Sequence, residues 1–428
     1  MTVSLLASES VKAEKMTSAT KRRILVAHPG TQYSLHLARE LERRDLLLRF
    51  WAGFAIAGSG WAFRFIDLLP RALRKQIAAR VVVGVPASKV RTLPSLEWSS
   101  RGSLRRADQE AMLFERNRRF QEAIPATEIA LADVVVGFDT SSWQLARRAK
   151  EMGKIFILDQ SIGHPAAKER VYSSLREKFP AWSSSLPRKQ DAHVAREREE
   201  HDLADLIVVP SKFVMSTLIE EGVSPGKIRV IPFGTDLELF RLPGPNGDPA
   251  TYPKVVVLYA GTFTARKGLP VLLAAWKRLR VSSAAELWLV GSGTIPAAEL
   301  QQLPDSVKVL GQRTREELSS LMNRADAFVF PSFFEGLAQV QLEALATGLP
   351  VIATYESGAE EVIEPGENGL LVRAGDESGL TQALQRLVDD SALRLEMRKA
   401  AEKSRSSLSW SLYGDRWERL LLEIDRGC

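Results

Sequence analysis

The sequence contains almost no cysteine, since Cys428 is the single one among 428 residues. This scarcity excludes an internal disulfide framework and a cysteine-ligated metal cluster, and it is typical of a reducing compartment such as the cytoplasm. Long apolar runs are missing as well. The most apolar window, "FWAGFAIAGSGWAF" at 50–63, has fourteen residues, whereas a membrane-spanning helix needs about twenty. We therefore expect no transmembrane helix.

The first twenty residues, "MTVSLLASESVKAEKMTSAT", also lack the sustained apolar core of a signal peptide. We predict a disordered leader at 1–20.

Acidic residues are fewer than basic ones, and one stretch of the chain accounts for the difference. The net charge is +6, yet residues 61–120 alone contain thirteen Lys/Arg against five Asp/Glu, interleaved with aromatic residues and leucines. Such a surface can dock on anionic lipid or on an acidic acceptor, which would place a cytoplasmic protein at the inner face of the membrane. A solvated helical face remains the alternative. No nucleic-acid-binding motif accompanies the charge, so nucleic acid is not an expected partner.

Short apolar, β-branched runs alternate with segments of helical periodicity along the whole chain. The runs are continuously apolar, as in strands buried on both faces of a parallel sheet. This alternation predicts a doubly wound α/β fold. The predicted strands lie within 22–30, 46–53, 133–139, 154–160, 205–211, 228–234, 255–261, 286–293, 307–312, 327–332, 350–354 and 369–372.

A Pro/Gly-rich stretch interrupts this alternation at 240–253, "FRLPGPNGDPATYP". Because the chain is too long for one core, we predict two α/β domains with a ligand site in the cleft between them. The first covers 21–240 and the second 254–404, joined by a linker at 241–253. The tail at 405–428 is predicted to be an aromatic-rich amphipathic helix that caps the second domain or packs back on the first.

Two glycine-containing turns follow strands of the second domain. "AGTFTARKG" at 260–268 contains Gly261, Arg266 and Lys267 before a helix, where backbone amides and two cations can hold a pyrophosphate. "VGSGT" at 290–294 contains Gly291, which allows close backbone approach to a ligand but suits any tight turn. Neither turn completes a P-loop or a dinucleotide fingerprint, so each signal is weak by itself.

The segment "FFEGLAQVQLEALATGLPVIAT" at 333–354 contains two carboxylates, Glu335 and Glu343. The pattern predicts a helix that begins near Gly336, with Glu335 at its positive N-terminus and free amides at Gly336, Leu337 and Ala338. Glu343 lies two turns further in, beside an apolar stripe, where a carboxylate suits the two hydroxyls of a ribose. A plain amphipathic helix with a capped N-terminus is the alternative.

Taken together and in this order, these segments resemble the family-four (group 1) retaining glycosyltransferases, which have the GT-B fold of two facing Rossmann-like domains. The resemblance is strong over 250–390 and weaker over 204–240. It implies that Glu335 contacts donor-sugar hydroxyls, Glu343 the ribose, and Arg266 with Lys267 the diphosphate. The loop at Gln312 and Arg313 is then expected to meet the base. The sequence departs from the family at Leu337 and Ala338, where an aromatic residue and a glycine are more usual.

The resemblance also implies site residues in the first domain. Gly30, in "HPGTQYS" at 28–34, corresponds to the family's glycine-rich loop near the donor phosphates. An ordinary turn that requires a glycine explains this residue equally well. His164, in "DQSIGHP" at 159–165, is expected near the reacting carbon of the donor sugar. Asp139 is the competing acceptor-side residue, and its alternative role is to cap the helix that follows.

The implied activity is transfer of a sugar, with retention, from a UDP- or GDP-linked donor to a glycan or lipid-linked acceptor. Cell-envelope, exopolysaccharide or glycolipid synthesis is the expected context. The cations and helix amides would stabilise the leaving diphosphate in place of a metal, and no cofactor is expected beyond the nucleotide-sugar co-substrate. Alternatives are a non-catalytic sugar-nucleotide-binding or scaffold protein and, on the same architecture, a nucleotide-sugar epimerase or a phosphorylase.

Overall fold

The computed structural model describes residues 22–30, 33–58, 80–95, 106–188, 191–243, 254–280 and 285–426. The chain divides into two compact units. The first comprises the described residues of Met1–Leu158, Leu203–Asp205 and Glu418–Cys428, and the second comprises those of Asp159–Asp202 and Leu206–Trp417. The predicted leader at 1–20 and most of the predicted linker at 241–253 lie outside the described residues. The predicted domain boundaries stay a prediction.

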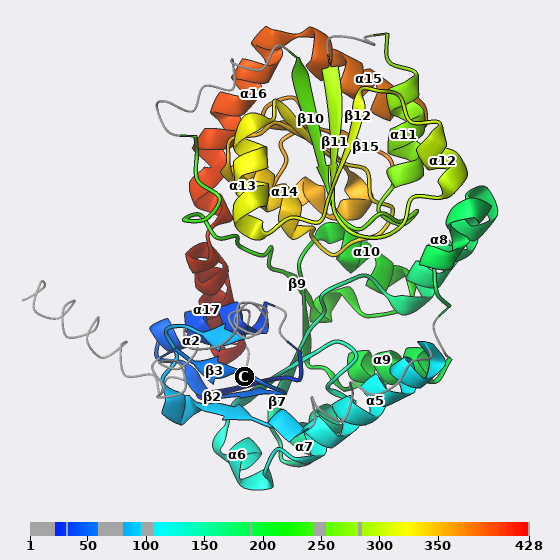
Figure 1. Ribbon diagram of the computed structural model, residues 1–428. Helices are drawn as coiled ribbons and strands as arrows, with labels where there is room; N and C mark the ends of the chain where they lie inside the picture. The colour runs from blue at the N-terminus through cyan, green and yellow to red at the C-terminus, as the bar shows by residue number, and fades with distance from the viewer. Residues whose placement is uncertain are drawn as a thin grey trace, which may run out of the picture. The chain divides into compact units, whose positions relative to one another are not determined.

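The N-terminal half of the chain builds a sheet with the strand order β5-β2-β1-β6-β7-β8-β9 (Figure 1). Neighbouring strands pair in parallel where β1 meets β2 and β6, where β2 meets β5, and where β8 meets β9. Sequential order reverses between β1 and β6, which makes this the topological switch point of the sheet. The strands are β1 (Ile24–His28), β2 (Leu47–Ala52), β5 (Val90–Thr92), β6 (Val134–Phe138), β7 (Ile155–Asp159), β8 (Leu206–Val209) and β9 (Ile228–Val230).

Helices follow these strands, as the alternating pattern predicts. Helix α7 shows the expected apolar stripe, since it buries Trp143, Leu145, Ala146 and Ala149. Strand β5 and the two-residue strands β3 (Ile56–Ala57) and β4 (Val81–Val82) were not predicted from the sequence. The helices are α2 (Ser34–Arg43), α5 (Arg106–Glu122), α6 (Ala126–Leu131), α7 (Trp143–Glu151), α8 (Pro165–Lys178), α9 (Asp191–Leu203) and α10 (Lys212–Glu220).

The C-terminal half builds a second parallel sheet, with the order β12-β11-β10-β13-β14-β15. This is the strand order of a dinucleotide-binding Rossmann sheet, and its switch point lies between β10 and β13. The strands are β10 (Val255–Ala260), β11 (Ala285–Val290), β12 (Val307–Gly311), β13 (Ala327–Phe330), β14 (Val351–Thr354) and β15 (Gly369–Val372). Helices α11 (Leu269–Lys277), α12 (Ala297–Gln301), α13 (Arg315–Arg324), α14 (Gln339–Ala346), α15 (Glu377–Asp389) and α16 (Ser391–Ser404) surround it.

The segment between β9 and β10 is tied to the segment that leads into the last helix, α17 (Trp410–Arg426). The N–H of Thr235 donates to the carbonyl of Leu408 at 2.7 Å. The Arg405 guanidinium donates to the carbonyls of Leu237, Phe240 and Ala346. One side chain therefore holds three carbonyls from two separate parts of the chain.

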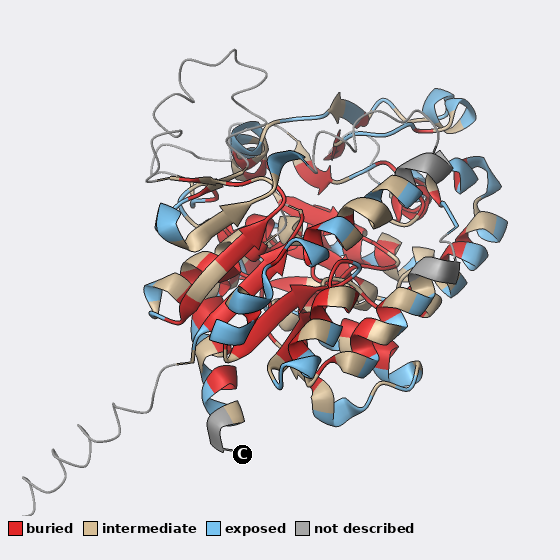
Figure 2. Cartoon of the chain, turned by 90° about the horizontal axis from the view of Figure 1, so that it is seen from below, coloured by how far each residue is buried: buried red, intermediate tan, exposed pale blue. Residues whose placement is uncertain are grey.

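Buried residues concentrate on the strands, whereas exposed ones lie on the outward faces of the helices (Figure 2). No helix in the described part of the chain is both long and apolar enough to span a bilayer. Much of the basic stretch at 61–120 lies outside the described residues. In its described part, Arg118 and Arg119 of α5 form ion pairs with Glu115 and Glu122, so part of the excess charge is locally neutralised.

Candidate active site

Three loops at the carboxyl ends of β10, β11 and β12 are joined by backbone hydrogen bonds. The N–H of Gly261 donates to Val290 at 2.9 Å, that of Phe263 to Ser292 at 2.7 Å, and that of Gly291 to Gly311 at 3.0 Å. Gly291 has a φ of 153°, and a Cβ there would lie 1.8 Å from the Gly261 carbonyl oxygen. The two glycines predicted to face a ligand are therefore in contact, and close backbone packing alone requires Gly291.

Arg266 and Lys267 follow β10 and meet Glu335, which follows β13. Glu335 Oε1 forms an ion pair with the Arg266 guanidinium and lies 2.6 Å from Lys267 Nζ. The Ser332 hydroxyl donates to the same carboxylate oxygen at 3.0 Å, and Arg266 also donates to the Phe334 carbonyl at 2.7 Å. The predicted cations and the first predicted carboxylate thus form one cluster at the switch point of the sheet.

Burial sets the electrostatics of this cluster. The Lys267 ammonium lies 5.1 Å from the centre of the Phe330 ring. Burial lowers the pKa of Lys267, whereas the Glu335 carboxylate opposes that shift and the nearby Arg266 adds to it. Two cations beside one carboxylate leave a positive excess in a poorly solvated place, and such a place favours an anion.

The structure corrects the predicted start of the helix that follows β13. Helix α14 begins at Gln339, with Ala338 as its N-cap, and not near Gly336. The N–H of Glu335 instead donates to Glu356, and that of Ala338 to Ser357 at 3.4 Å, because residues 355–357 run alongside. Glu335 therefore lies in a loop before the helix, and the predicted free amide at Ala338 is wrong.

Helix α14 is buried on all sides from Gln341 onward and is not half exposed. Glu343 is only 8% exposed, and Arg315 Nη2 donates to its Oε1 at 3.0 Å. Burial raises the pKa of Glu343, Arg315 opposes the rise, and Asp236 adds to it.

Arg315 was not predicted from the sequence as a site residue, whereas Gln312 and Arg313 were. Those two side chains lie exposed in the turn between β12 and α13. The available signal was the capping box of Thr314 and Glu317, which makes Arg315 the first residue of a helix at the end of a strand.

The loop between β7 and α8 packs directly against the loop that contains Glu335. A Cβ at Gly336 would lie 1.9 Å from the Ser161 carbonyl oxygen, and a Cβ at Gly163 would lie 2.6 Å from the Phe334 ring. The Ser211 hydroxyl also donates to the Gly336 carbonyl at 2.5 Å. The structure therefore brings the predicted loops 159–165 and 333–338 together.

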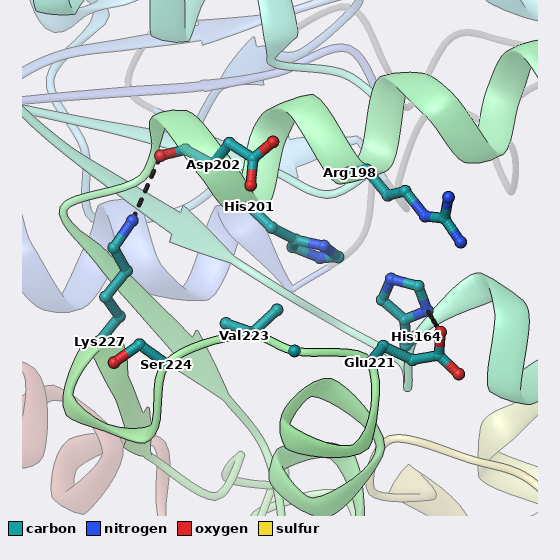
Figure 3. Close-up of a pocket in the computed structure, with 9 residues that line it drawn as sticks. His164, Arg198, His201, Asp202, Glu221, Val223, Ser224 and Lys227 are labelled. Carbon is teal, nitrogen blue, oxygen red and sulfur yellow. Dashed lines mark hydrogen bonds and ion pairs between the residues drawn. The ribbon is translucent and has the colours of Figure 1, made fainter.

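The His164 ring at the end of this loop is 1% exposed and caps its own helix, since Nδ1 accepts from the Ala166 N–H at 3.2 Å. Its backbone N–H donates to the Thr217 hydroxyl at 3.0 Å. Figure 3 shows the ring beside Glu221, 3.9 Å from Nδ1 to Oε2, and facing a polar cavity of about 310 Å³. The cavity is lined by His164, Arg198, His201, Asp202, Glu221, Gly222, Val223, Ser224 and Lys227.

Gly30 and Asp139 lie in the first unit, after β1 and β6, at the switch point of their sheet. The N–H of Gly30 donates to Nδ1 of His28 at 3.1 Å, and the His28 ring lies 4.7 Å from Phe138. Burial lowers the pKa of His28 to about 4. Asp139 is 8% exposed, and the N-cap of α7 is Ser142, so the capping alternative for Asp139 is wrong.

Known proteins resemble this chain in sequence and in fold. Residues 254–390 match a family model described as glycosyl transferases group 1. The chain is 30% identical over 258 residues to the MMP alpha-(1->4)-mannosyltransferase of Mycolicibacterium hassiacum, covering 58% of this chain and 60% of that protein. It is 31% identical over 252 residues to the D-inositol 3-phosphate glycosyltransferase of Corynebacterium jeikeium, covering 53% and 59%. The chain thus spans about three fifths of the length of these relatives.

Solved structures show the same fold over nearly the whole chain. Sucrose-phosphate synthase from Thermosynechococcus elongatus superimposes with a TM-score of 0.64 at 21% identity, covering 95% of this chain and 100% of that one. Anabaena HepE, solved in complex with UDP and glucose, gives 0.62 at 17% identity, covering 94% and 100%. Residues 254–390 therefore resemble the group 1 glycosyltransferases, and the chain has the GT-B fold, built from two Rossmann-like domains.

Proposed function

We propose that this protein transfers a sugar from a nucleoside diphosphate sugar to a glycan or lipid-linked acceptor, with retention at the anomeric carbon. The observation that carries the proposal is the cluster of Arg266, Lys267 and Glu335 at the switch point between β10 and β13. Ligands of open α/β sheets bind at the carboxyl ends of the strands at this point.

Each member of the cluster has a distinct task in this proposal. Arg266 and Lys267 hold the diphosphate and stabilise the charge that develops on it as the glycosidic bond breaks. The Glu335 carboxylate, kept between the cations, accepts hydrogen bonds from hydroxyls of the donor sugar. Glu343 accepts those of the ribose. The base lies against the turn at Gln312 and Arg313, and no metal is needed where two cations already face the phosphates.

Gly30, His164 and Asp139 complete the proposed site. Gly30 belongs beside the donor phosphates, and His164 near the reacting carbon. The contact of loop 159–165 with loop 333–338 supports the assignment of His164. Because Nδ1 accepts from the Ala166 N–H, a neutral His164 imidazole has its proton on Nε2. Asp139 is proposed on the acceptor side.

The acceptor class is proposed from the relatives. They include a glycogen synthase of Mycobacterium tuberculosis and enzymes named for amylovoran, colanic acid and lipopolysaccharide core biosynthesis. These names refer to the synthesis of saccharide polymers or lipopolysaccharide, and we propose a glycan or lipid-linked saccharide as the acceptor on that ground. The basic stretch at 61–120 would bring the protein to an anionic membrane, and co-sedimentation with phosphatidylglycerol vesicles tests this part separately.

Thermal unfolding in the presence of nucleoside diphosphates tests the donor site. A ligand that binds only the folded protein raises the thermal midpoint by mass action, because at one hundred times its Kd it adds about 2.7 kcal/mol to the free energy of unfolding. We expect UDP or GDP to raise the thermal midpoint of the wild type. In Lys267→Ala and Glu335→Gln we expect either this rise or the turnover of the matching nucleotide sugar to be lost. Lys277→Ala, an exposed lysine near the end of α11, is the matched control.

The product of turnover separates the competing functions. Retention appears as a product anomer of the same configuration as the donor, read from the anomeric proton coupling, and equal rates with and without EDTA support metal independence. A wild type that binds a nucleotide sugar but never transfers to saccharide acceptors is a binding protein. Unchanged turnover in Lys267→Ala and Glu335→Gln would show that the site is wrongly assigned.

A further inference from the structure

Glu343 is a carboxylate in a place that disfavours its charge. Its side chain is 10% exposed, on a helix that is buried on all sides. Burial raises its pKa, and Asp236 on the segment after β9 raises it further. A protonated Glu343 would lose part of its ability to accept hydrogen bonds from hydroxyl groups. Glu343 therefore stays ionised, and able to accept hydrogen bonds from a ligand, only if a neighbouring group counteracts the rise in its pKa.

Arg315 provides that offset from the first turn of α13. Its Nη2 donates to Glu343 Oε1 at 3.0 Å, and its side chain is 54% exposed, so the guanidinium spans from solvent to the buried carboxylate. The guanidinium carbon lies 5.2 Å from the centre of the Phe240 ring, and Phe240 is fully buried. The ring face limits where the cation can lie, and the capping box of α13 fixes the helix end that carries it.

We propose that Arg315 is the positioning residue of the nucleotide-ribose site, which keeps Glu343 ionised and oriented so that it accepts both ribose hydroxyls. The inference rests on the proposed function, because it names the ribose as the ligand of Glu343. Arg315 occupies one lone pair of Oε1, and a carboxylate has about four lone-pair positions. Room for two donors remains, and Arg315 itself need not touch the nucleotide.

The experiment measures ribose recognition separately from the binding of phosphates. The Kd of the tightest-binding member of UDP, GDP and ADP is compared with that of its 2′-deoxy form by titration calorimetry between pH 5.5 and 9. The ratio of the two Kd values cancels the protonation of the diphosphate, which both ligands share. The proteins are the wild type, Arg315→Gln, Arg315→Lys, Glu343→Gln and, as the matched control on the same helix, Arg324→Gln.

We expect the wild type to prefer the ribonucleotide by about tenfold at pH 7, the size of a hydrogen bond to a charged group. Loss of Arg315 leaves burial and Asp236 unopposed, so the pKa of Glu343 rises and the carboxylate is protonated at a higher pH. In Arg315→Gln the preference is therefore several-fold smaller than in the wild type at pH 7 and recovers as the pH rises. Arg315→Lys retains most of it, and Glu343→Gln shows a reduced preference that does not change with pH.

Two results would overturn the inference at different levels. If Arg315→Gln, folded by circular dichroism, shows the preference and pH profile of the wild type and of Arg324→Gln, then Arg315 does not act on Glu343. The proposed function would survive that result. The wild type could instead bind no nucleoside diphosphate, or bind one without any preference for the ribonucleotide. Either result would show that the donor site itself is wrongly placed, and the proposed role of Arg315 would be refuted as well.

Discussion

Acidification provides a direct test of the environment described for His28. The ring is 5% exposed, its Nδ1 accepts from the Gly30 N–H, and its edge meets Phe138. Burial lowers the pKa of this imidazole from 6.5 to about 4, and the nearby charge of Arg116 adds to the shift. The folded protein therefore keeps His28 neutral over a pH range in which an unfolded histidine takes up a proton.

The sign and size of the effect follow from these two pKa values. Between pH 6.5 and 4 the unfolded state binds more protons, so the free energy of unfolding falls as the pH falls. The contribution of His28 to the free energy of unfolding is intact above pH 6.5. It is about 2 kcal/mol smaller at pH 5 and about 3 kcal/mol smaller below pH 4. Urea unfolding at pH 7.5 and pH 5 measures it in the wild type and in His28→Asn, which retains an acceptor for Gly30.

The difference between the two proteins isolates His28 from the other titrating groups. We expect the wild type to lose about 2 kcal/mol more than His28→Asn between pH 7.5 and pH 5. Nuclear magnetic resonance of ¹³C-labelled histidine gives the pKa directly, because the chain has only five histidines and the variant assigns one. Parallel pH dependence in the two proteins, or a ring that titrates near 6.5, would refute the buried neutral imidazole.

Three further expectations concern the second unit. Glu335→Gln leaves two cations without a carboxylate and should lower the free energy of unfolding by about 1–3 kcal/mol, measured by urea unfolding, with added pyrophosphate restoring part of it; equal stability would contradict the cluster. Gly336→Ala drives a methyl group into the Ser161 carbonyl and should lower the thermal midpoint and abolish sugar transfer, whereas Gly226→Ala, with 3.7 Å of clearance, should do neither. Arg405→Ala releases three carbonyls and should speed hydrogen exchange in 235–240; unchanged exchange there would argue against the tie.

The fold was predictable because its signals are local. Every predicted apolar run contains a strand, and runs such as "VVVLYAG" are apolar throughout because parallel strands are covered on both faces. The strands that were missed, such as β3 and β4, have two residues each and leave no periodic pattern. The strand order was not predicted; in the structure it places β10 beside β13, so that the cations and Glu335 meet at the switch point.

The details of the site depended on contacts between distant parts of the chain. The start of α14 was misplaced because the N–H of Glu335 bonds to Glu356, twenty-one residues further on, and this bond has no local signature. Arg315 was missed for the same reason, since its partner Glu343 belongs to a different helix. The burial of the His164 ring in its own helix cap likewise required the packing of α9 and α10 around it.

The backbone bonds that join the ends of β10, β11 and β12 imply that this side of the site is preorganised. Gly261, Phe263 and Gly291 already have their amide hydrogens engaged before any nucleotide arrives. Binding therefore incurs little ordering entropy there, and the heat capacity change should reflect the surface that the ligand covers and not a folding transition. These amides should be slow to exchange in the ligand-free protein, so the loop that we propose to hold the diphosphate behaves as a rigid template.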